Sequence, residues 1–145
     1  MKRTFVILLA IFIVVGIATY FSRFFDLPID INIKPDNKEE LIVVISPLKD
    51  DQISSPLSIA GRARGQWFFE GSFPIELQDE YKNVIAEGHA TAQGEWMTED
   101  FVPFLGTLQF NNYIPGHEGF LILRKDNPSG LSEHDDHIRI PVIFE

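Results

Sequence analysis

Cysteine is absent from the sequence of 145 residues. Its absence excludes disulfide bonds, thiolate metal sites, cysteine nucleophiles and a lipid-modified cysteine anchor. The folded part of the chain must therefore be stabilised by packing alone. Basic residues are also few, with 12 Lys and Arg against 21 Asp and Glu. A helical periodicity is missing after the first 25 residues, which argues against a helical domain.

The charge of the chain is unevenly distributed. Lys2, Arg3 and Arg23 flank an apolar first segment, so residues 26–145 carry nine basic and 21 acidic side chains. This balance of −12 disfavours nucleic acid as a partner, because phosphate contacts supply most of the non-specific affinity for nucleic acid. With an apolar first segment, the chain has room for one domain of about 100 residues.

The first segment has the length and composition of a membrane span. Residues 4–21 are 18 uncharged residues, and a helix of that length is about 27 Å long, close to the hydrocarbon thickness of a bilayer. Aromatic residues follow around Arg23, as at a membrane interface. We expect residues 1–25 to be an uncleaved transmembrane anchor. Because Lys2 and Arg3 precede the span, the amino terminus would lie in the cytoplasm and the domain outside the cell.

A cleaved secretory signal is the alternative. Residues 16–18 (Gly-Ile-Ala) are a poor small-x-small cleavage site, and the uncharged run is longer than the about 7 to 15 apolar residues of a signal peptide. Cleavage there would release a soluble ligand-binding domain. Residues 26–40, with Pro28 and Pro35 among several Asp and Asn, are expected to form an extended tether in front of a domain over 41–145.

Residues 67–104 carry the clearest strand pattern. From Trp67 to Leu77, apolar residues or glycine occupy every second position, as in a strand with one buried face. A polar turn at 79–83 and a return strand at 84–92 complete a long hairpin. The same reasoning predicts a strand at 67–78 and five further strands, at 41–45, 57–64, 101–110, 119–125 and 137–144.

Two residues in these strands carry positional information. Pro103 indicates an edge strand or a bulge, and Gly61 indicates a bulge or the close approach of a neighbour. Seven short strands separated by turns predict an all-β, immunoglobulin-like sandwich of two sheets, preceded by one transmembrane helix. A closed barrel of the oligonucleotide-binding topology is the alternative, but an acidic surface disfavours its usual ligands.

A combination of short sequences resembles the immunoglobulin-like domain of bacterial spore germination proteins. Its opening is carried by residues 45–47 (Ile-Ser-Pro) and 54–64 (Ser-Ser-Pro-Leu-Ser-Ile-Ala-Gly-Arg-Ala-Arg). The resemblance continues through residues 69–73, Ile75 and Leu77, 90–92, 94–96, Phe101 and Phe104, and 140–142. It covers residues 41–144. The resemblance implies an extracytoplasmic β-sandwich of a bacterial envelope protein, with no established catalytic residues.

Two basic side chains are candidates for binding. Arg62 and Arg64 alternate on the polar face of the strand predicted at 57–64, in a domain with few basic residues. Guanidinium groups in this arrangement could clamp an anionic group, such as a carboxylate of a ligand or partner. The alternative is that they pair with surface acids such as Glu70 or Glu76.

Aromatic residues are a second candidate. Phe68 falls on the polar face of the strand that is predicted to begin at Trp67, and Trp96 follows the hairpin. An exposed aromatic cluster would suit the binding of carbohydrate or protein. The alternative is that both tryptophans pack in the core and that Phe68 packs under a loop. Together, Arg62, Arg64, Phe68 and Trp96 are the predicted interaction surface.

No catalytic or metal site is predicted. Serine, histidine and aspartate lie near one another at 129–135, but no sharp strand-to-helix turn of the G-x-S-x-G kind presents a serine. Residues 133–137 (Glu-His-Asp-Asp-His) are the densest run of metal ligands, and Asp135 could converge with His137 on a divalent ion. A polar turn in which Asp135 or Asp136 caps backbone amides is the alternative. We expect no enzyme activity and no cofactor.

These features predict a non-catalytic, membrane-anchored module that mediates interactions outside the cell, at the bacterial cell envelope. The module would reach the membrane through residues 1–25, and its other partner would be an envelope protein or glycan. A secreted, soluble ligand-binding domain released by signal cleavage is the alternative function.

Overall fold

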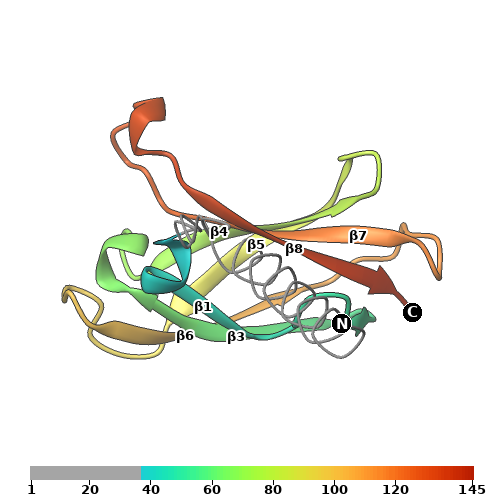
Figure 1. The fold of residues 1–145 in the computed structure, drawn as a ribbon, viewed down its shortest axis with the longest axis horizontal. Coiled ribbons are helices and arrows are strands. Elements are labelled where there is room, and N and C mark those ends of the chain that lie inside the picture. Colours follow the sequence, from blue (N-terminus) through green and yellow to red (C-terminus); the bar gives the residue numbers. More distant parts are fainter. Residues whose placement is uncertain (1–36) are drawn as a thin grey trace, which may run out of the picture. The chain divides into compact units, whose positions relative to one another are not determined.

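The computed structural model describes residues 37–145, which form an all-β domain with short 3-10 helices (Figure 1). The expected anchor at 1–25 and the expected tether up to residue 36 lie outside the described residues. The last four residues of that tether form a 3-10 helix, η1 (Asn37–Glu40), and are not extended. Within the described part of the chain, no helix is long and apolar enough to cross a membrane.

Eight strands and two further 3-10 helices follow η1 in the described residues. They are β1 (Ile42–Ser46), β2 (Gln52–Ile53), β3 (Leu57–Arg64), η2 (Gly65–Trp67), β4 (Ser72–Asp79), β5 (Val84–Ala92), β6 (Phe101–Leu108), β7 (Glu118–Arg124), η3 (Ser132–His134) and β8 (His137–Phe144). The strands predicted at 57–64, 84–92 and 137–144 have the predicted bounds. The prediction omits β2, because two residues are too few to show an alternating pattern.

The strands form one continuous sheet in the order β1-β3-β6-β5-β4-β7-β8-β2, which curls into two facing layers (Figure 1). The all-β prediction is confirmed, but the two layers are not separate sheets. The link is β5, which pairs with β4 over residues 84–91 and with β6 over residues 90–92. A long strand shared in this way continues the hydrogen bonding from one layer into the other. β2 pairs with β8 in parallel, so the sheet is mixed.

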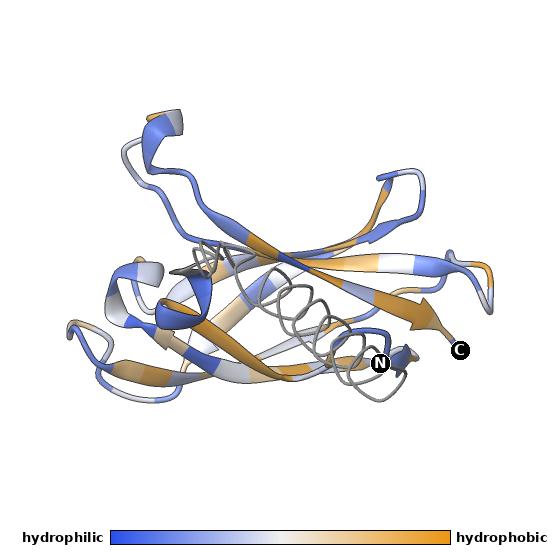
Figure 2. Ribbon diagram, in the orientation of Figure 1, coloured by the Kyte–Doolittle hydropathy of each residue, from blue (hydrophilic) through white to orange (hydrophobic). Residues whose placement is uncertain are grey.

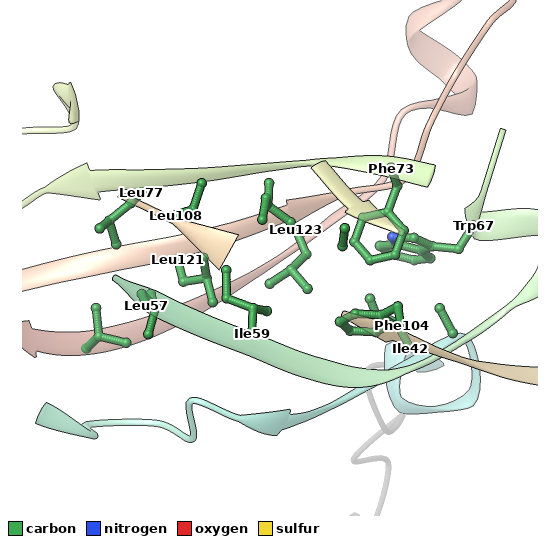
Figure 3. Packing of buried hydrophobic residues seen from close by; sticks show 14 of the residues in the cluster. Ile42, Leu57, Ile59, Trp67, Phe73, Leu77, Phe104, Leu108, Leu121 and Leu123 are labelled. Carbon is green, nitrogen blue, oxygen red and sulfur yellow. The ribbon is translucent and has the colours of Figure 1, made fainter. Parts of the chain in front are cut away.

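Side chains from both layers meet in one apolar core (Figure 3). Phe73, Ile75 and Leu77 alternate inward along β4, as predicted, and are at most 1% exposed. The Phe73 and Phe104 rings meet edge to face, with 5.0 Å between their centroids. The connections between strands are mainly hydrophilic (Figure 2). Because no polar or charged side chain of residues 37–145 is buried, apolar packing holds the layers together.

The chain from Trp67 to Gly71 is not part of a strand, which corrects the strand start predicted at Trp67. Helix η2 ends at Trp67, and β4 begins at Ser72. Between them, Glu70 and Gly71 have positive φ angles of 50° and 77°, so the backbone is not extended there. The two-residue alternation is therefore interrupted, and both Trp67 and Phe68 are buried.

Pro103 and Gly61 test the positional predictions. Strand β6 is flanked by β3 and β5, and Pro103 pairs in register with Arg62, so the prediction of an edge strand or a bulge is wrong. The Pro103 carbonyl accepts a hydrogen bond from the Gln93 N–H at 2.8 Å. The missing N–H of proline therefore faces the end of β5, where the strand pairing has stopped. The close approach predicted at Gly61 is confirmed, because a Cβ there would collide with the Phe104 ring.

Candidate functional site

Arg62 and Arg64 lie on the outer face of β3, as predicted, over the ring of Phe101. The Arg64 guanidinium is 4.2 Å from the ring centroid, and that of Arg62 is 5.1 Å away. Arg64 also donates to two main-chain carbonyls, from Nε to Glu40 at 3.1 Å and from Nη1 to Glu99 at 3.0 Å. Through these two hydrogen bonds, Arg64 of β3 holds both η1 and the loop before β6.

Neither arginine pairs with the acids considered for them. Glu76 binds Arg124 instead, with 3.1 Å between Oε2 and Nη2. Among residues 37–145, Arg62 and Arg64 form no salt bridge. Arg62 is exposed, so it is the member of the pair that a partner can reach, whereas Arg64 has a structural role.

Phe68 and Trp96 do not form an exposed aromatic surface. Phe68 is 4% exposed and packs on Phe73, with 5.3 Å between the ring centroids. Its assignment to the surface is therefore wrong, because the alternation on which it depends does not extend back from β4. Trp96 is half-buried and packs against the core. The four predicted residues thus do not make up one surface.

A cleft of about 330 Å³, here called the end cleft, opens beside the β4–β5 turn. It lies between that turn, the loop from β6 to β7 and the end of β8. Its lining is partly polar and partly aromatic, and includes Asp79, Glu80, Tyr81, Asn83, Tyr113 and His117.

The Asp79 carboxylate organises the turn side of the end cleft. It accepts hydrogen bonds from the Tyr81 N–H at 2.9 Å, the Asn83 N–H at 2.8 Å and the Asn83 side-chain amide at 2.8 Å. The side-chain hydrogen bond from Asn83 is the main cause that lowers the pKa of Asp79. The turn predicted at 79–83 is confirmed, with Lys82 at a φ of 68°. This turn holds Tyr81 outward, 73% exposed.

The loop side of the end cleft is attached both to the turn and to β8. His117 Nδ1 lies 2.7 Å from Glu80 Oε1 and joins the loop to the turn. Tyr113 stacks on Phe144, with 5.2 Å between the ring centroids. Between Tyr113 and His117 in the sequence, Ile114 is 59% exposed. The β4–β5 turn and the loop from β6 to β7 are therefore both held in place, and each presents a large exposed side chain.

Sequence reasoning does not identify the end cleft, because its residues come from three distant segments. His117 and Glu80 are 37 positions apart and share no motif. The turn at 79–83 is the signal that could have located it, since Asp and Asn at its ends indicate a tight turn that carries an exposed tyrosine.

Residues 133–137 do not converge on a metal ion. The Asp135 carboxylate accepts a hydrogen bond from the Asn127 side-chain amide at 2.7 Å, and Asp136 pairs with Lys38 at 3.0 Å. Across residues 37–145, no group of three or more His, Asp and Glu side chains is placed to hold an ion. Residues 133–137 are thus part of the polar connection that leads into β8, and Lys38 of η1 holds this connection through Asp136.

Comparison with protein families matches residues 41–132 to the model Gmad2, described as the immunoglobulin-like domain of bacterial spore germination. The matched part runs from the residue before β1 into η3, so β8 lies beyond it, although the resemblance noted above extends to residue 144. A search of curated proteins finds no match. Because the family match covers more than half of the chain, this protein belongs to the family of immunoglobulin-like domains of bacterial spore germination.

Proposed function

We propose that this protein is a non-catalytic immunoglobulin-like module that is anchored in the bacterial membrane through residues 1–25 and binds a partner at the cell envelope. An anchor is supported by the 18 uncharged residues behind Lys2 and Arg3. A binding role without catalysis is supported by membership of a family of immunoglobulin-like germination domains.

The binding part of the proposal rests on the end cleft. Its two connections are fixed by the Asp79 hydrogen bonds and by the contact between His117 and Glu80. They present Tyr81 and Ile114, which are 73% and 59% exposed. Large side chains on connections that are already ordered suit the centre of a contact surface, because little further ordering is needed on binding. The partner is an envelope protein or glycan.

Site-specific photocrosslinking tests this function. Benzoylphenylalanine replaces Tyr81 or Ile114 in the full chain, expressed in cells that normally make it. Leu105, which is 54% exposed on β6 and outside the end cleft, is the matched control position. We expect crosslinked products from positions 81 and 114 and none from position 105. Equal yields at all three positions, or no product at any of them, would contradict the proposal.

A secreted, soluble domain is the second candidate, because residues 16–18 have the small-x-small pattern of a cleavage site, in a poor version. It differs from the anchored form in its amino terminus and in its location. Amino-terminal sequencing of the protein recovered from cells and from medium decides between them. A chain that begins at Thr19 and is found in the medium supports secretion, whereas an intact chain in the membrane fraction supports the anchor.

A further inference from the structure

A second hollow, of about 460 Å³, lies between β1 and β8 and is here called the β1–β8 groove. Its lining residues belong to 38–39, 42–44, 47–49 and 138–141. None of them lines the end cleft. The groove is therefore a separate site, on the side of the curled sheet where its first strand faces β8.

Strand β1 presents an unpaired edge to this groove. In the described sheet its only neighbour is β3. The Leu41 carbonyl accepts a hydrogen bond from the Arg64 N–H of β3 at 2.8 Å, and main-chain groups alternate in direction along an antiparallel pair. Ile42 and Val44 therefore direct their N–H and C=O groups away from β3. Ile42 is only 2% exposed, so Val44 is the position of this edge that a partner can reach. Such an edge is a template for the addition of another strand.

The edge of β8 that faces β1 accepts hydrogen bonds at two positions and is open between them. The Lys38 amino group donates to the His137 carbonyl at 2.8 Å, and the Asp50 N–H donates to the Pro141 carbonyl at 2.8 Å. The same alternation directs the N–H and C=O of Arg139, midway between them, toward the groove. Strand β2 pairs only with the far end of β8 and does not cover this gap.

The groove is basic although the domain is acidic. Lys38, Lys49 and Arg139 line it, which are three of the nine basic side chains after residue 25, together with the single carboxylate of Glu39. Lys38 is paired with Asp136 at 3.0 Å. Among residues 37–145, Lys49 and Arg139 form no salt bridge. Two cations are thus available to acidic side chains of an occupant.

Apolar side chains make up most of the remaining lining. Val44, Ile138 and Ile140 are half-buried in the groove. Leu48 is 56% exposed, and Ile45 beside the groove is 61% exposed. Figure 2 shows the hydrophobic character of β1. An occupant that covered these residues would remove apolar surface from water.

We propose that the β1–β8 groove binds an extended segment of a partner polypeptide in which apolar and acidic side chains alternate. The segment adds to the β1 edge as a strand and hydrogen-bonds to the main chain of Val44. The open edges require an extended backbone, the apolar lining selects one face of the segment, and Lys49 and Arg139 select carboxylates on the other.

Peptide titration tests this inference on the full chain, kept in mild detergent because of its apolar first segment. The probe is a short fluorescent peptide of alternating Val and Glu, and a peptide of alternating Val and Lys is the charge control. A third peptide carries an N-methyl group on every residue, which removes its N–H donors, obstructs both of its edges and keeps its side chains. We expect saturable binding of the Val-Glu peptide alone, measured by fluorescence anisotropy. Equal binding of either control peptide would overturn the proposal.

Charge-reversed variants locate the site. The double variant Lys49→Glu with Arg139→Glu should weaken binding of the Val-Glu peptide by about tenfold or more, because it replaces two attractions by repulsions. Arg139 also stacks over Phe120, at 3.5 Å from its centroid, so Lys49→Glu alone is the variant that tests charge without disturbing packing. Lys82→Glu is the control: it makes the same charge change as Lys49→Glu, but in the β4–β5 turn, and should leave the affinity for the Val-Glu peptide unchanged. Equal affinities in all variants would overturn the proposal.

Hydrogen exchange supplies a readout that is independent of charge. The Val44 amide should exchange more slowly when the Val-Glu peptide is bound, while the amide of Tyr81 in the end cleft should not change. Protection at Tyr81 without protection at Val44 would overturn the groove proposal. It would leave the function proposed for the end cleft intact, so the two failures are distinguishable.

Discussion

Replacement of Phe68 by alanine is expected to destabilise the domain by about 3 to 5 kcal/mol, the usual cost of removing a buried phenylalanine. Phe68 is 4% exposed, and its ring packs on Phe73 with 5.3 Å between the centroids. The substitution therefore removes apolar contacts and leaves a cavity beside Phe73, which is itself completely buried. A loss of this size is a large fraction of the about 5 to 15 kcal/mol that stabilises a typical domain.

Phe69→Ala is the matched control, because it removes the same side chain from the next position. Phe69 is 42% exposed, so its removal leaves no closed cavity and should cost about 1 kcal/mol or less. Because both variants lose the same side chain, the difference between their free energies of unfolding reports the effect of burial. A continuous strand from Trp67 would require the reverse order, with Phe69 inside and Phe68 outside.

Urea denaturation of the wild type and the two variants measures this difference. The chain has two tryptophans, and the change in their fluorescence as the completely buried Trp67 becomes exposed should report loss of the core on unfolding. We expect a clearly lower urea midpoint for Phe68→Ala than for Phe69→Ala, with similar slopes. If Phe69→Ala were as costly as Phe68→Ala, or more so, the interruption of the strand between Trp67 and β4 would be refuted.

Three further predictions concern other parts of the chain. Arg64→Ala should destabilise the domain by about 1 to 2 kcal/mol in the same assay, because two main-chain carbonyls lose their donor, whereas Arg62→Ala should stay within about 0.5 kcal/mol; equal effects would contradict the structural role of Arg64. Since the folded-state pKa of Asp79 is lowered, its contribution to stability is present above the ordinary value of 3.8 and is lost as the pH falls through the lower folded-state value. The urea midpoint of the wild type should therefore decrease more over this range than that of Asp79→Asn, and parallel decreases would refute the assignment. Finally, the full chain should stay with membranes after an alkaline carbonate wash, and its release into the supernatant would count against the anchor over 1–25.

Local periodicity was sufficient to predict most of the strands. Residues 57–64 alternate between more buried and more exposed positions without interruption, and most of 84–92 and the first half of 137–144 follow the same rule, so each segment indicates its own strand. The inward residues of β4 follow from the same rule. The family resemblance could also be recognised from short local sequences, and the match over 41–132 confirms it.

The pattern is misleading where the backbone changes conformation within an apolar stretch. The positive φ angles of Glu70 and Gly71 interrupt the alternation, so Phe68 enters the core although the sequence indicates the surface. Pro103 is tolerated inside the sheet because its missing N–H faces the end of β5. Both outcomes depend on which neighbours a residue meets, and a one-dimensional pattern does not contain that information.

The sequence by itself determined the all-β class, most strand positions, the acidic surface and the family. Only the tertiary structure decided where the two proposed binding surfaces lie. The end cleft joins Glu80 to His117, and the β1–β8 groove joins β1 to a strand almost a hundred residues later. The contact between Glu80 and His117 lies at the end of the antiparallel pair of β4 and β7, in which Asp79 is opposite Gly119. The β1–β8 groove exists because β5 carries the sheet from one layer into the other, which brings these two distant strands together. Side chains that meet only through this curl leave no local signal in the sequence.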